Sequence, residues 1–353
     1  MANTKSRSRR GLRVLLWAGS IFALAQLGGG LLLDYCWPAL RFPEVGRVLT
    51  QLRAREHMPE VVCMGSSRSE GGFRTPIIDH VLQQFLRQPP HTFNAAVNGG
   101  DPVVAEWLLE RMLREGRHPG LLVLEVSPEF LSRRTPLLSQ QVLRQMTWLD
   151  LPRYMPDAFL YTHPMRLITS RILPLYTHRY QIRRQLFLAA LSNPASSQPQ
   201  KSLVESDVEP CEDRDLVPPS VPVPPAPPQA STTPAPVAYL SPSFKDFQLS
   251  HLETAALERL LRRCRDEKIE VQLLGFPLME GCRALQTPEI DRVFLGYVHD
   301  LTAKYGCRFV DLRDRIPDYG FGDGLHVNDL GGEYFSQILA REVLIPLWRE
   351  LHP

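Results

Sequence analysis

The stretch that decides the fold runs from residue 60 to residue 69 and reads EVVCMGSSRS. The apolar run Val61–Met64 has the length and composition expected for a strand that is buried on both faces. One glycine and two serines follow it directly, and both residue types are typical of tight turns. The stretch therefore predicts a central strand of a parallel sheet, ending in a turn that carries hydroxyl groups.

The pattern of short apolar runs and amphipathic helices continues beyond this stretch. Further strands are predicted at Thr92–Ala95, Leu121–Val126, Glu270–Phe276 and Arg308–Asp311, and helices over 75–86, 101–115, 250–267, 288–304 and 331–350. Strands that alternate with helices are typical of a parallel sheet covered by helices on both faces. The predicted fold class is α/β, a three-layer α/β/α sandwich with a mostly parallel sheet, over residues 55–353.

Two segments interrupt this pattern in the middle of the chain. Residues 130–192 are predicted to form a helical insert that is rich in arginine. The segment that follows, 193–245, is rich in proline. Within it, residues 194–242 contain 13 of the 32 prolines of the chain, together with Ser, Thr, Ala and Gln. Such a composition cannot bury enough apolar surface to offset the entropy lost on ordering. We therefore expect a disordered loop within one α/β domain, rather than a boundary between two domains.

The N-terminal residues determine the expected compartment. A basic tail, 1–13, precedes an uncharged run from Val14 to Leu33, and the whole segment 14–35 is long enough to cross a bilayer. Basic flanks stay in the cytoplasm, so this pattern predicts a single-pass anchor with the α/β domain outside the cytoplasm. A cleaved signal peptide is the alternative, because Ala23-Leu24-Ala25 resembles a cleavage site. Either interpretation predicts an exported domain.

Composition excludes several classes of function. The formal net charge is +2, and the chain contains no basic stripe or motif of a nucleic-acid reader. The six cysteines show no CxxC or Cys/His spacing, so neither a metal site nor a cofactor is expected. Cys63 is expected to be a small buried apolar residue. In an oxidising compartment, Cys264, Cys282 and Cys307 can form one disulfide, whose pairing stays open.

Three loops, each after a predicted strand, contain residues suited to catalysis. They are Gly65–Ser69, Asn94–Asp101 and Asp323–Asn328. In open α/β sheets, ligands bind at the carboxyl ends of the strands, so the three loops can meet at one site. A carboxylate three residues before a histidine can accept a hydrogen bond from Nδ1 and leave Nε2 free to act as a base. Each loop taken alone is also compatible with an ordinary turn.

Taken together and in this order, the loops resemble the motif blocks of the SGNH/GDSL hydrolase superfamily, which implies a flavodoxin-like fold. By that resemblance Ser67 is the nucleophile, and Asp323 and His326 complete a catalytic triad. Gly99 matches the glycine whose N–H binds the oxyanion. The resemblance covers roughly residues 60–130 and 250–350.

The chain departs from the family pattern at two positions. Ser66 stands where the family has Asp, and the third block, Glu125–Glu129, lacks the Asn whose side chain binds the oxyanion. Ser127 is the expected substitute donor.

The Gly-Ser-Ser turn, the Ser-Pro pair in the third block and the N-terminal anchor together resemble one subset of the superfamily. That subset contains the D-alanyl-lipoteichoic-acid transfer proteins and the alginate O-acetylation proteins. The resemblance implies a serine ester hydrolase or O-acyltransferase that acts on acyl esters of envelope polysaccharide or polymer, with a membrane protein as a potential acyl donor. The alternatives are an inactive polymer-binding or assembly protein of the same fold and a soluble exported lipase.

Overall fold

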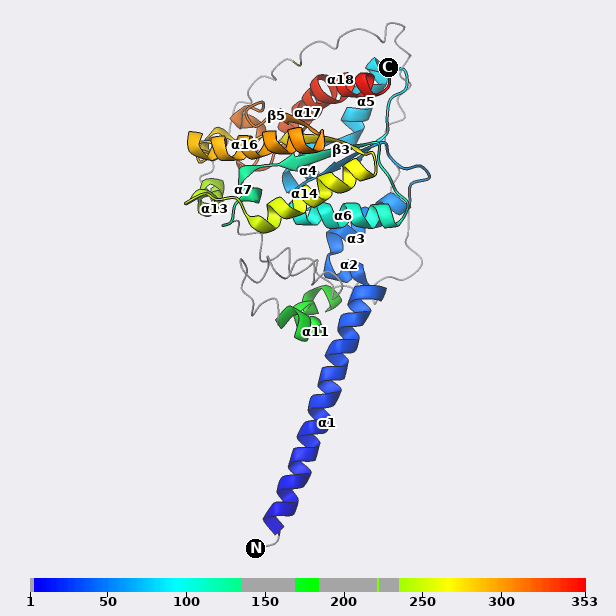
Figure 1. Ribbon diagram of the computed structural model, residues 1–353, viewed down its shortest axis with the longest axis vertical. Coiled ribbons are helices and arrows are strands. Elements are labelled where there is room, and N and C mark those ends of the chain that lie inside the picture. Colours follow the sequence, from blue (N-terminus) through cyan, green and yellow to red (C-terminus); the bar gives the residue numbers. More distant parts are fainter. Residues whose placement is uncertain (1–2, 135–168, 184–220, 222–234) are drawn as a thin grey trace. The chain divides into compact units, whose positions relative to one another are not determined.

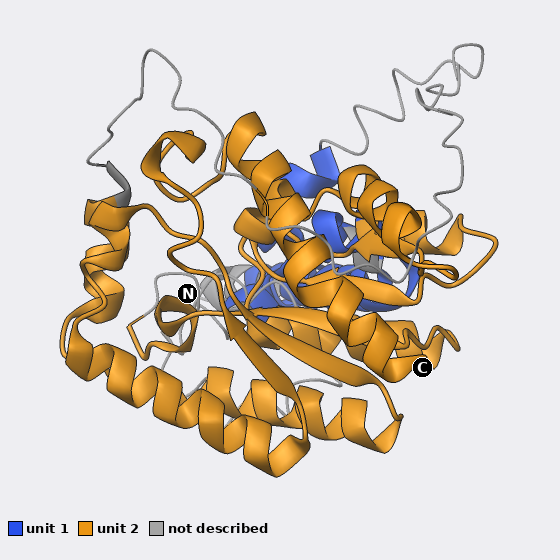
Figure 2. Ribbon diagram, turned by 90° about the horizontal axis from the view of Figure 1, so that it is seen from above, with its two compact units in different colours: residues 1–47, 142–203 blue, residues 48–141, 204–353 orange. Residues whose placement is uncertain are grey.

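The computed structural model describes residues 3–134, 169–183, 221 and 235–353. The chain divides into two compact units, which are residues 1–47 with 142–203 and residues 48–141 with 204–353 (Figure 2). Most of the predicted basic insert and most of the predicted proline-rich loop lie outside the described residues, so over those parts the two predictions stay untested.

The larger unit is built on a five-stranded sheet in which all neighbouring strands are parallel. The strands are β1 (Val61–Met64), β2 (Thr92–Asn94), β3 (Leu121–Val126), β4 (Glu270–Gly275) and β5 (Arg308–Asp311). Their order in the sheet is β2-β1-β3-β4-β5. Every strand lies within one residue of its predicted bounds, and the predicted α/β fold class with a parallel sheet is confirmed.

The register of the central strands determines where the site is formed. Val61 pairs with Leu121 and Met64 pairs with Leu124, so β1 and β3 run side by side in the same direction. Cys63 pairs with Asn94, at the end of β2. The loops that follow these three strands therefore leave the sheet at the same edge.

Helices cover both faces of the sheet (Figure 1). On one side lie α5 (Thr75–Phe85), α17 (Asp329–Ile338) and α18 (Ile345–Leu351), and on the other lie α6 (Pro102–Arg114) and α14 (His251–Asp266), with α16 (Pro288–Tyr305) packed on α14. Further helices are α3 (Pro43–Arg53), α4 (Ser67–Gly72), α7 (Pro128–Leu131), α15 (Glu280–Arg283) and the 3₁₀ turn η2 (Asp318–Gly320). Asp101 and Ser250 begin the two long helices α6 and α14, because their side chains accept hydrogen bonds from the exposed N–H groups of the first turn.

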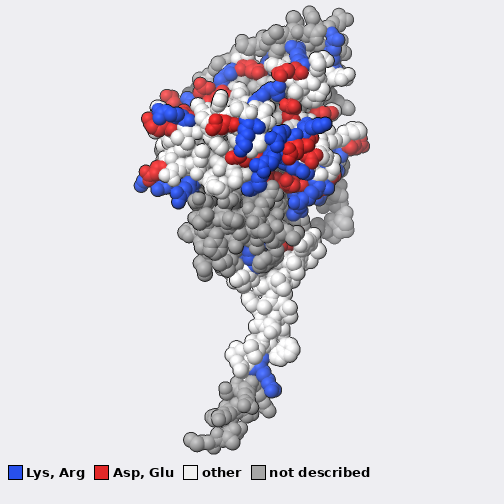
Figure 3. Space-filling model, in the orientation of Figure 1, with Lys and Arg blue, Asp and Glu red and all other residues white. Residues whose placement is uncertain are grey.

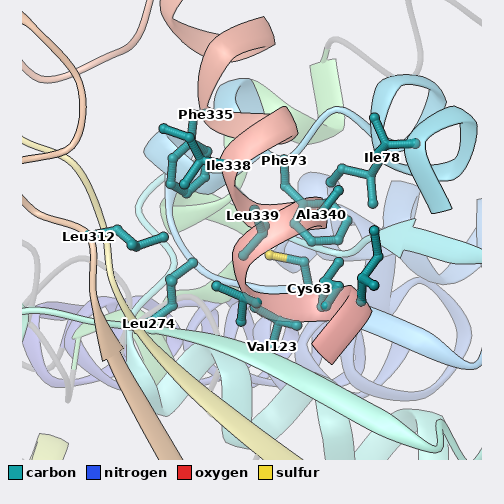
Figure 4. Packing of buried hydrophobic residues seen from close by; sticks show 14 of the residues in the cluster. Cys63, Phe73, Ile78, Val123, Leu274, Leu312, Phe335, Ile338, Leu339 and Ala340 are labelled. Atoms are coloured by element: carbon teal, nitrogen blue, oxygen red, sulfur yellow. The ribbon is translucent and has the colours of Figure 1, made fainter. Parts of the chain in front are cut away.

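Alternate residues of the strands face the apolar core beneath α5 and α17. Cys63 and Val123 lie in this cluster with Phe73 and Phe335, as Figure 4 shows. The Cys63 side chain is buried, and burial raises the pKa of its thiol well above the ordinary range. Cys63 is therefore a small apolar core residue, as its position in the strand predicted. Among the described cysteines, which include Cys264, Cys282 and Cys307, all are free thiols.

The last helix differs from the single helix predicted over 331–350. It consists of α17, a π-helical segment η3 (Leu339–Leu344) and α18. Pro346 lies in the first turn of α18 and has no N–H to donate to the preceding turn. The extra residue of a π-turn accommodates the interrupted hydrogen-bond ladder, which explains the break.

Residues 235–245 were expected inside the disordered loop, but α13 (Ala235–Phe244) forms there. Leu240 and Phe244 of this helix pack with Leu278, Cys282 and Ile290 in a separate apolar cluster. Burial of these apolar side chains offsets the conformational entropy that this part of the segment loses when it becomes ordered. The composition of the segment did not indicate this burial.

The smaller unit contains the N-terminal helix α1 (Asn3–Leu31), which continues into the π-turn η1 (Leu32–Cys36) and is followed by α2 (Pro38–Arg41). The segment Gly11–Cys36 is long and apolar enough to cross a membrane. Most of its apolar side chains are exposed, Leu15 and Trp17 by 71% and 70%, and Figure 3 shows this stretch of α1 as an almost uncharged surface. Within the same unit, the backbone N–H of Leu175 in α11 (Pro174–Thr177) donates to Gln26 of α1.

Candidate active site

The turn after β1 presents Ser67 at the first position of α4. Ser66 caps this helix, since its Oγ accepts a hydrogen bond from the Arg68 N–H at 3.1 Å. At Gly65 a Cβ would lie 2.5 Å from an oxygen of Glu125 and 2.6 Å from Ser69 Oγ. Only glycine fits there, so the chain can turn sharply and leave the Ser67 hydroxyl on the accessible side.

Ser67, His326 and Asp323 form one hydrogen-bonded row. Ser67 Oγ lies 2.8 Å from His326 Nε2, and His326 Nδ1 lies 2.7 Å from Asp323 Oδ2. The other carboxylate oxygen of Asp323 accepts hydrogen bonds from the backbone N–H groups of Leu325 and His326. Partial burial tends to raise the pKa of Asp323, but the ring and backbone hydrogen bonds outweigh it, so the pKa is lowered. The carboxylate therefore stays ionised, which favours the Nδ1–H tautomer of His326.

The loop after β2 packs directly on the nucleophile turn. The Val97 N–H donates to the Gly65 carbonyl at 3.0 Å, and a Cβ at Gly100 would lie 2.1 Å from that same oxygen. Gly99 has a positive φ of 67°, a conformation that suits glycine. Among the described residues, the N–H groups of Ser67 and Gly99 have no hydrogen-bond partner. Two backbone donors are therefore free beside the Ser67 hydroxyl.

A pocket of about 300 Å³ opens at these loops. Ser67, Gly99 and His326 line it, and so does Asn98, whose side chain makes no hydrogen bond within the described part of the chain. The rest of the wall comes from the nucleophile turn, from α7 and α13, and from the last loop, namely Ser66, Arg68, Glu129, Phe130, Tyr239, Leu240 and Leu325. Ser67 thus faces a mainly apolar pocket with a few polar groups, the usual character of a small-ligand site.

Ser127 does not reach this pocket, which corrects its expected role as an oxyanion donor. Its side chain is fully buried, and its Oγ accepts a hydrogen bond from Arg68 Nη2 at 2.9 Å. The guanidinium of Arg68 is itself buried and binds the Ser127 hydroxyl inside the protein.

Arg68 is the centre of a buried charged cluster that includes Glu125 and Glu129. Its Nη2 lies 2.8 Å from Glu125 and its Nη1 lies 2.6 Å from Glu129. Glu125 also accepts hydrogen bonds from the Ser66 N–H at 2.7 Å and from Ser69 Oγ at 2.6 Å. Burial disfavours the charge of Arg68, but the two carboxylates raise its pKa overall. The cluster therefore links the end of β3 to the nucleophile turn.

Sequence reasoning missed several of these residues. Glu125 carried a usable signal, because it is the one carboxylate in the otherwise apolar strand Leu121–Val126. Asn98 lay in a loop already selected, but nothing in the sequence indicated that it lines the same pocket as Ser67. Tyr239 and Leu240 gave no signal at all, since they lie inside the segment that was predicted to be a disordered loop.

A second group of buried carboxylates lies behind the Gly99-Gly100 loop. Asp101 caps α6 by accepting a hydrogen bond from the Val104 N–H at 2.8 Å. Burial raises the pKa of Asp101 to about 7. Burial, together with the charge of Asp101, raises the pKa of Glu253 well above its usual range. The nearby Glu106 is neutralised by both nitrogens of an Arg259 fork, at 2.8 and 3.0 Å.

These pKa shifts predict a stability that falls as the pH rises. Asp101 binds a proton up to about pH 7 in the folded state, whereas the unfolded carboxyl releases it near pH 4. Between these values the folded state binds more protons, so raising the pH favours unfolding. Between pH 5 and pH 8 the wild type should therefore lose on the order of 2 kcal/mol of its free energy of unfolding. Asp101→Asn, which keeps the helix cap, should not show this loss.

The measurement is urea unfolding of the full chain in detergent at both pH values, with exposed Asp300→Asn as the matched control. Other carboxylates also make the free energy of unfolding depend on pH. The quantity to compare is therefore the difference between the wild type and each variant. If the free energy of unfolding depends on pH identically in the wild type and in Asp101→Asn, then Asp101 does not hold a proton in the folded state.

No family model matches the chain, and no curated protein matches its sequence. Twelve chains of solved structures match its fold. One is described as "Crystal Structure of TesA", with a TM-score of 0.37 and 12% identity, over 81% of this chain and 98% of that chain. A likeness of this size does not bear on function.

Proposed function

We propose that this protein is a serine ester hydrolase or O-acyltransferase that acts on acyl esters of envelope polysaccharide or polymer. The row Ser67–His326–Asp323, opening on a pocket with free backbone N–H groups, is the observation that carries the proposal. A hydroxyl bound to an imidazole that is itself oriented by a carboxylate is the arrangement that activates serine as a nucleophile.

The reaction proceeds in two steps. His326 Nε2 takes the proton of Ser67 as Oγ attacks the ester carbonyl, and it returns this proton to the departing alcohol oxygen. An acyl-serine remains, and water or a polymer hydroxyl then attacks it while His326 again accepts and returns one proton. Asp323 stabilises the imidazolium formed in each step. No cofactor takes part.

The oxyanion of each tetrahedral intermediate is bound by the N–H groups of Ser67 and Gly99. Asn98 supplies the third donor in place of the absent third-block asparagine, because its carboxamide lines the same pocket and has no other partner among the described residues. Ser127 does not take this role, because its side chain is fully buried and does not line the pocket.

The membrane location is part of the same proposal. The apolar segment Gly11–Cys36 anchors the chain, and the basic residues before it stay in the cytoplasm. The domain then works outside the cytoplasm, where envelope polymers are accessible and where a membrane protein can supply the acyl group.

The test is intact-mass analysis of the full chain in detergent after exposure to a fluorophosphonate. One adduct is expected on the wild type and none on Ser67→Ala, while Ser241→Ala, an exposed serine on α13, should be labelled like the wild type. Asn98→Ala should be labelled roughly 100-fold more slowly, the usual effect of losing one oxyanion donor. In cells, Ser67→Ala should lower the acyl content of the surface polymer if the protein transfers acyl groups, and raise it if the protein removes them.

A folded wild-type protein that forms no adduct would contradict the catalytic proposal. It would favour the second candidate, a polymer-binding or assembly protein. The specific observation that favours this candidate is the lack of an asparagine at the end of β3, where the family has an oxyanion donor.

A further inference from the structure

Helix α13 contributes part of the wall of the Ser67 pocket, and it lies outside the two regions that resemble the hydrolase superfamily. Tyr239 and Leu240 of this helix line the pocket together with Ser67 and His326. Leu240 is 6% exposed and Tyr239 is 47% exposed, so Leu240 belongs to the enclosed part of the wall and Tyr239 to its open part. The helix packs on α7 and α15, and Figure 1 shows it beside α7. The pocket is therefore completed by a segment that the catalytic motifs do not include.

Leu240 is held in place from two sides. It belongs to the apolar cluster that includes Phe244 and Ile290. Leu325, which directly precedes His326 and also lines the pocket, packs against the same cluster. Close-packed side chains shift little, because a shift opens a void or causes an overlap. Leu240 therefore forms a fixed wall, and this wall does not adapt to the ligand.

The size and composition of the pocket indicate which part of an ester it accepts. Its volume of about 300 Å³ lies at the lower end of the range for ligand pockets, and Phe130, Leu240 and Leu325 contribute apolar surface. A sugar or polyol unit of a polymer carries many hydroxyl groups, and burying them against such a surface without hydrogen-bond partners is costly. A short acyl chain has no such groups, and burial of its methylene groups is favourable. The acyl group is therefore the part that fits this pocket, and the polymer stays outside it.

We propose that the pocket binds the acyl group of the ester and that Leu240 limits its length, so that the protein selects short, apolar acyl groups. This inference rests on the ester chemistry proposed for Ser67, and it names the acyl class for that site. It makes Leu240 a specificity-determining residue that takes no part in bond making or breaking.

The test compares acetyl, butyryl, hexanoyl and octanoyl esters of one fluorogenic phenol on the full chain in detergent. For the wild type, kcat/KM is expected to fall steeply from butyryl to octanoyl, because each methylene that the wall excludes costs roughly 10-fold or more. The quantity compared between proteins is the ratio of kcat/KM for the hexanoyl ester to kcat/KM for the butyryl ester. The reactivity of the esters, their partition into detergent and the fraction of active protein cancel in this comparison.

Leu240→Ala removes an isopropyl group from the wall and should raise the ratio of hexanoyl to butyryl roughly 10-fold or more. Leu240→Phe extends the wall into the pocket and should lower the ratio of butyryl to acetyl by a similar factor. The matched control is Phe244→Ala, because Phe244 lies on the same helix and in the same apolar cluster but does not line the pocket. This control should weaken the packing of α13 at least as much and leave both ratios unchanged.

Unchanged ratios in both Leu240 variants, with turnover that still depends on Ser67, would overturn this inference and leave the proposed function intact. Equal shifts in Leu240→Ala and Phe244→Ala would also overturn it, because the ratio would then report the packing of α13. If one Leu240 variant does not fold, the other decides the test. Absence of any Ser67-dependent reaction, with esters and fluorophosphonate alike, would overturn both proposals.

Discussion

Replacement of His326 by alanine is expected to lower kcat/KM for an ester that the protein hydrolyses by about 10,000-fold or more. The physical reason is that, among the described residues, His326 Nε2 is the base within hydrogen-bond distance of Ser67 Oγ, at 2.8 Å, and an unassisted serine hydroxyl stays protonated at neutral pH. Asp323→Asn should cause a loss of similar size, because an asparagine can present its NH₂ group to the ring and favour the wrong tautomer.

The measurement is steady-state hydrolysis of a fluorogenic ester that the wild type hydrolyses, together with the rate of fluorophosphonate labelling at Ser67. The matched control is His299→Ala, an exposed histidine on α16, which should retain wild-type rates. The catalytic assignment would be contradicted by a folded His326→Ala protein that keeps more than a tenth of the wild-type rate.

Arg68→Met is expected to lower the free energy of unfolding by about 3–5 kcal/mol. Methionine fills a similar volume but leaves Glu125 and Glu129 buried without their shared cation. Removal of one partner from a buried ion cluster costs far more than removal of a surface ion pair, because the remaining charge is still desolvated. Combining the change with Glu129→Gln should recover part of the loss, since one of the two uncompensated charges is then absent.

Urea unfolding of the full chain in detergent measures this effect. Arg265→Met is the contrasting control, because Arg265 pairs with Asp266 on the surface at 3.3 Å, where such a pair contributes at most about 1 kcal/mol. A loss below 1 kcal/mol in Arg68→Met, equal to that of the control, would show that the cluster does not stabilise the nucleophile turn.

The strands and most helices were predictable because their signal is local. Val61–Met64 and Leu121–Val126 are apolar without interruption, as strands buried on both faces must be, and their predicted bounds match the structure. The helix predicted over 331–350 was wrong only in its continuity. Pro346 marks the break, but a proline near a helix end is compatible with several local geometries.

The sequence predicted which loops carry the site, but it did not predict the contacts of the polar side chains around it. The row from Ser67 to Asp323 was expected because three loops leave the sheet at one edge. Ser127 was expected at the oxyanion on the basis of its position after β3, yet Arg68 binds it away from the pocket. Helix α13 was unexpected, because its stability comes from contacts with Leu278 and Ile290 far along the chain.

The sequence by itself determined the strands, the nucleophile turn and the order of the three loops, since apolar periodicity and turn residues act over a few neighbouring positions. Only the tertiary structure decided which polar side chains face the pocket. Ser66 and Glu125 are 59 positions apart, and so are Arg68 and Ser127, yet each pair lies within hydrogen-bond distance. A contact of this kind depends on charge and burial across the folded sheet, and neither residue carries a local pattern that reveals its partner.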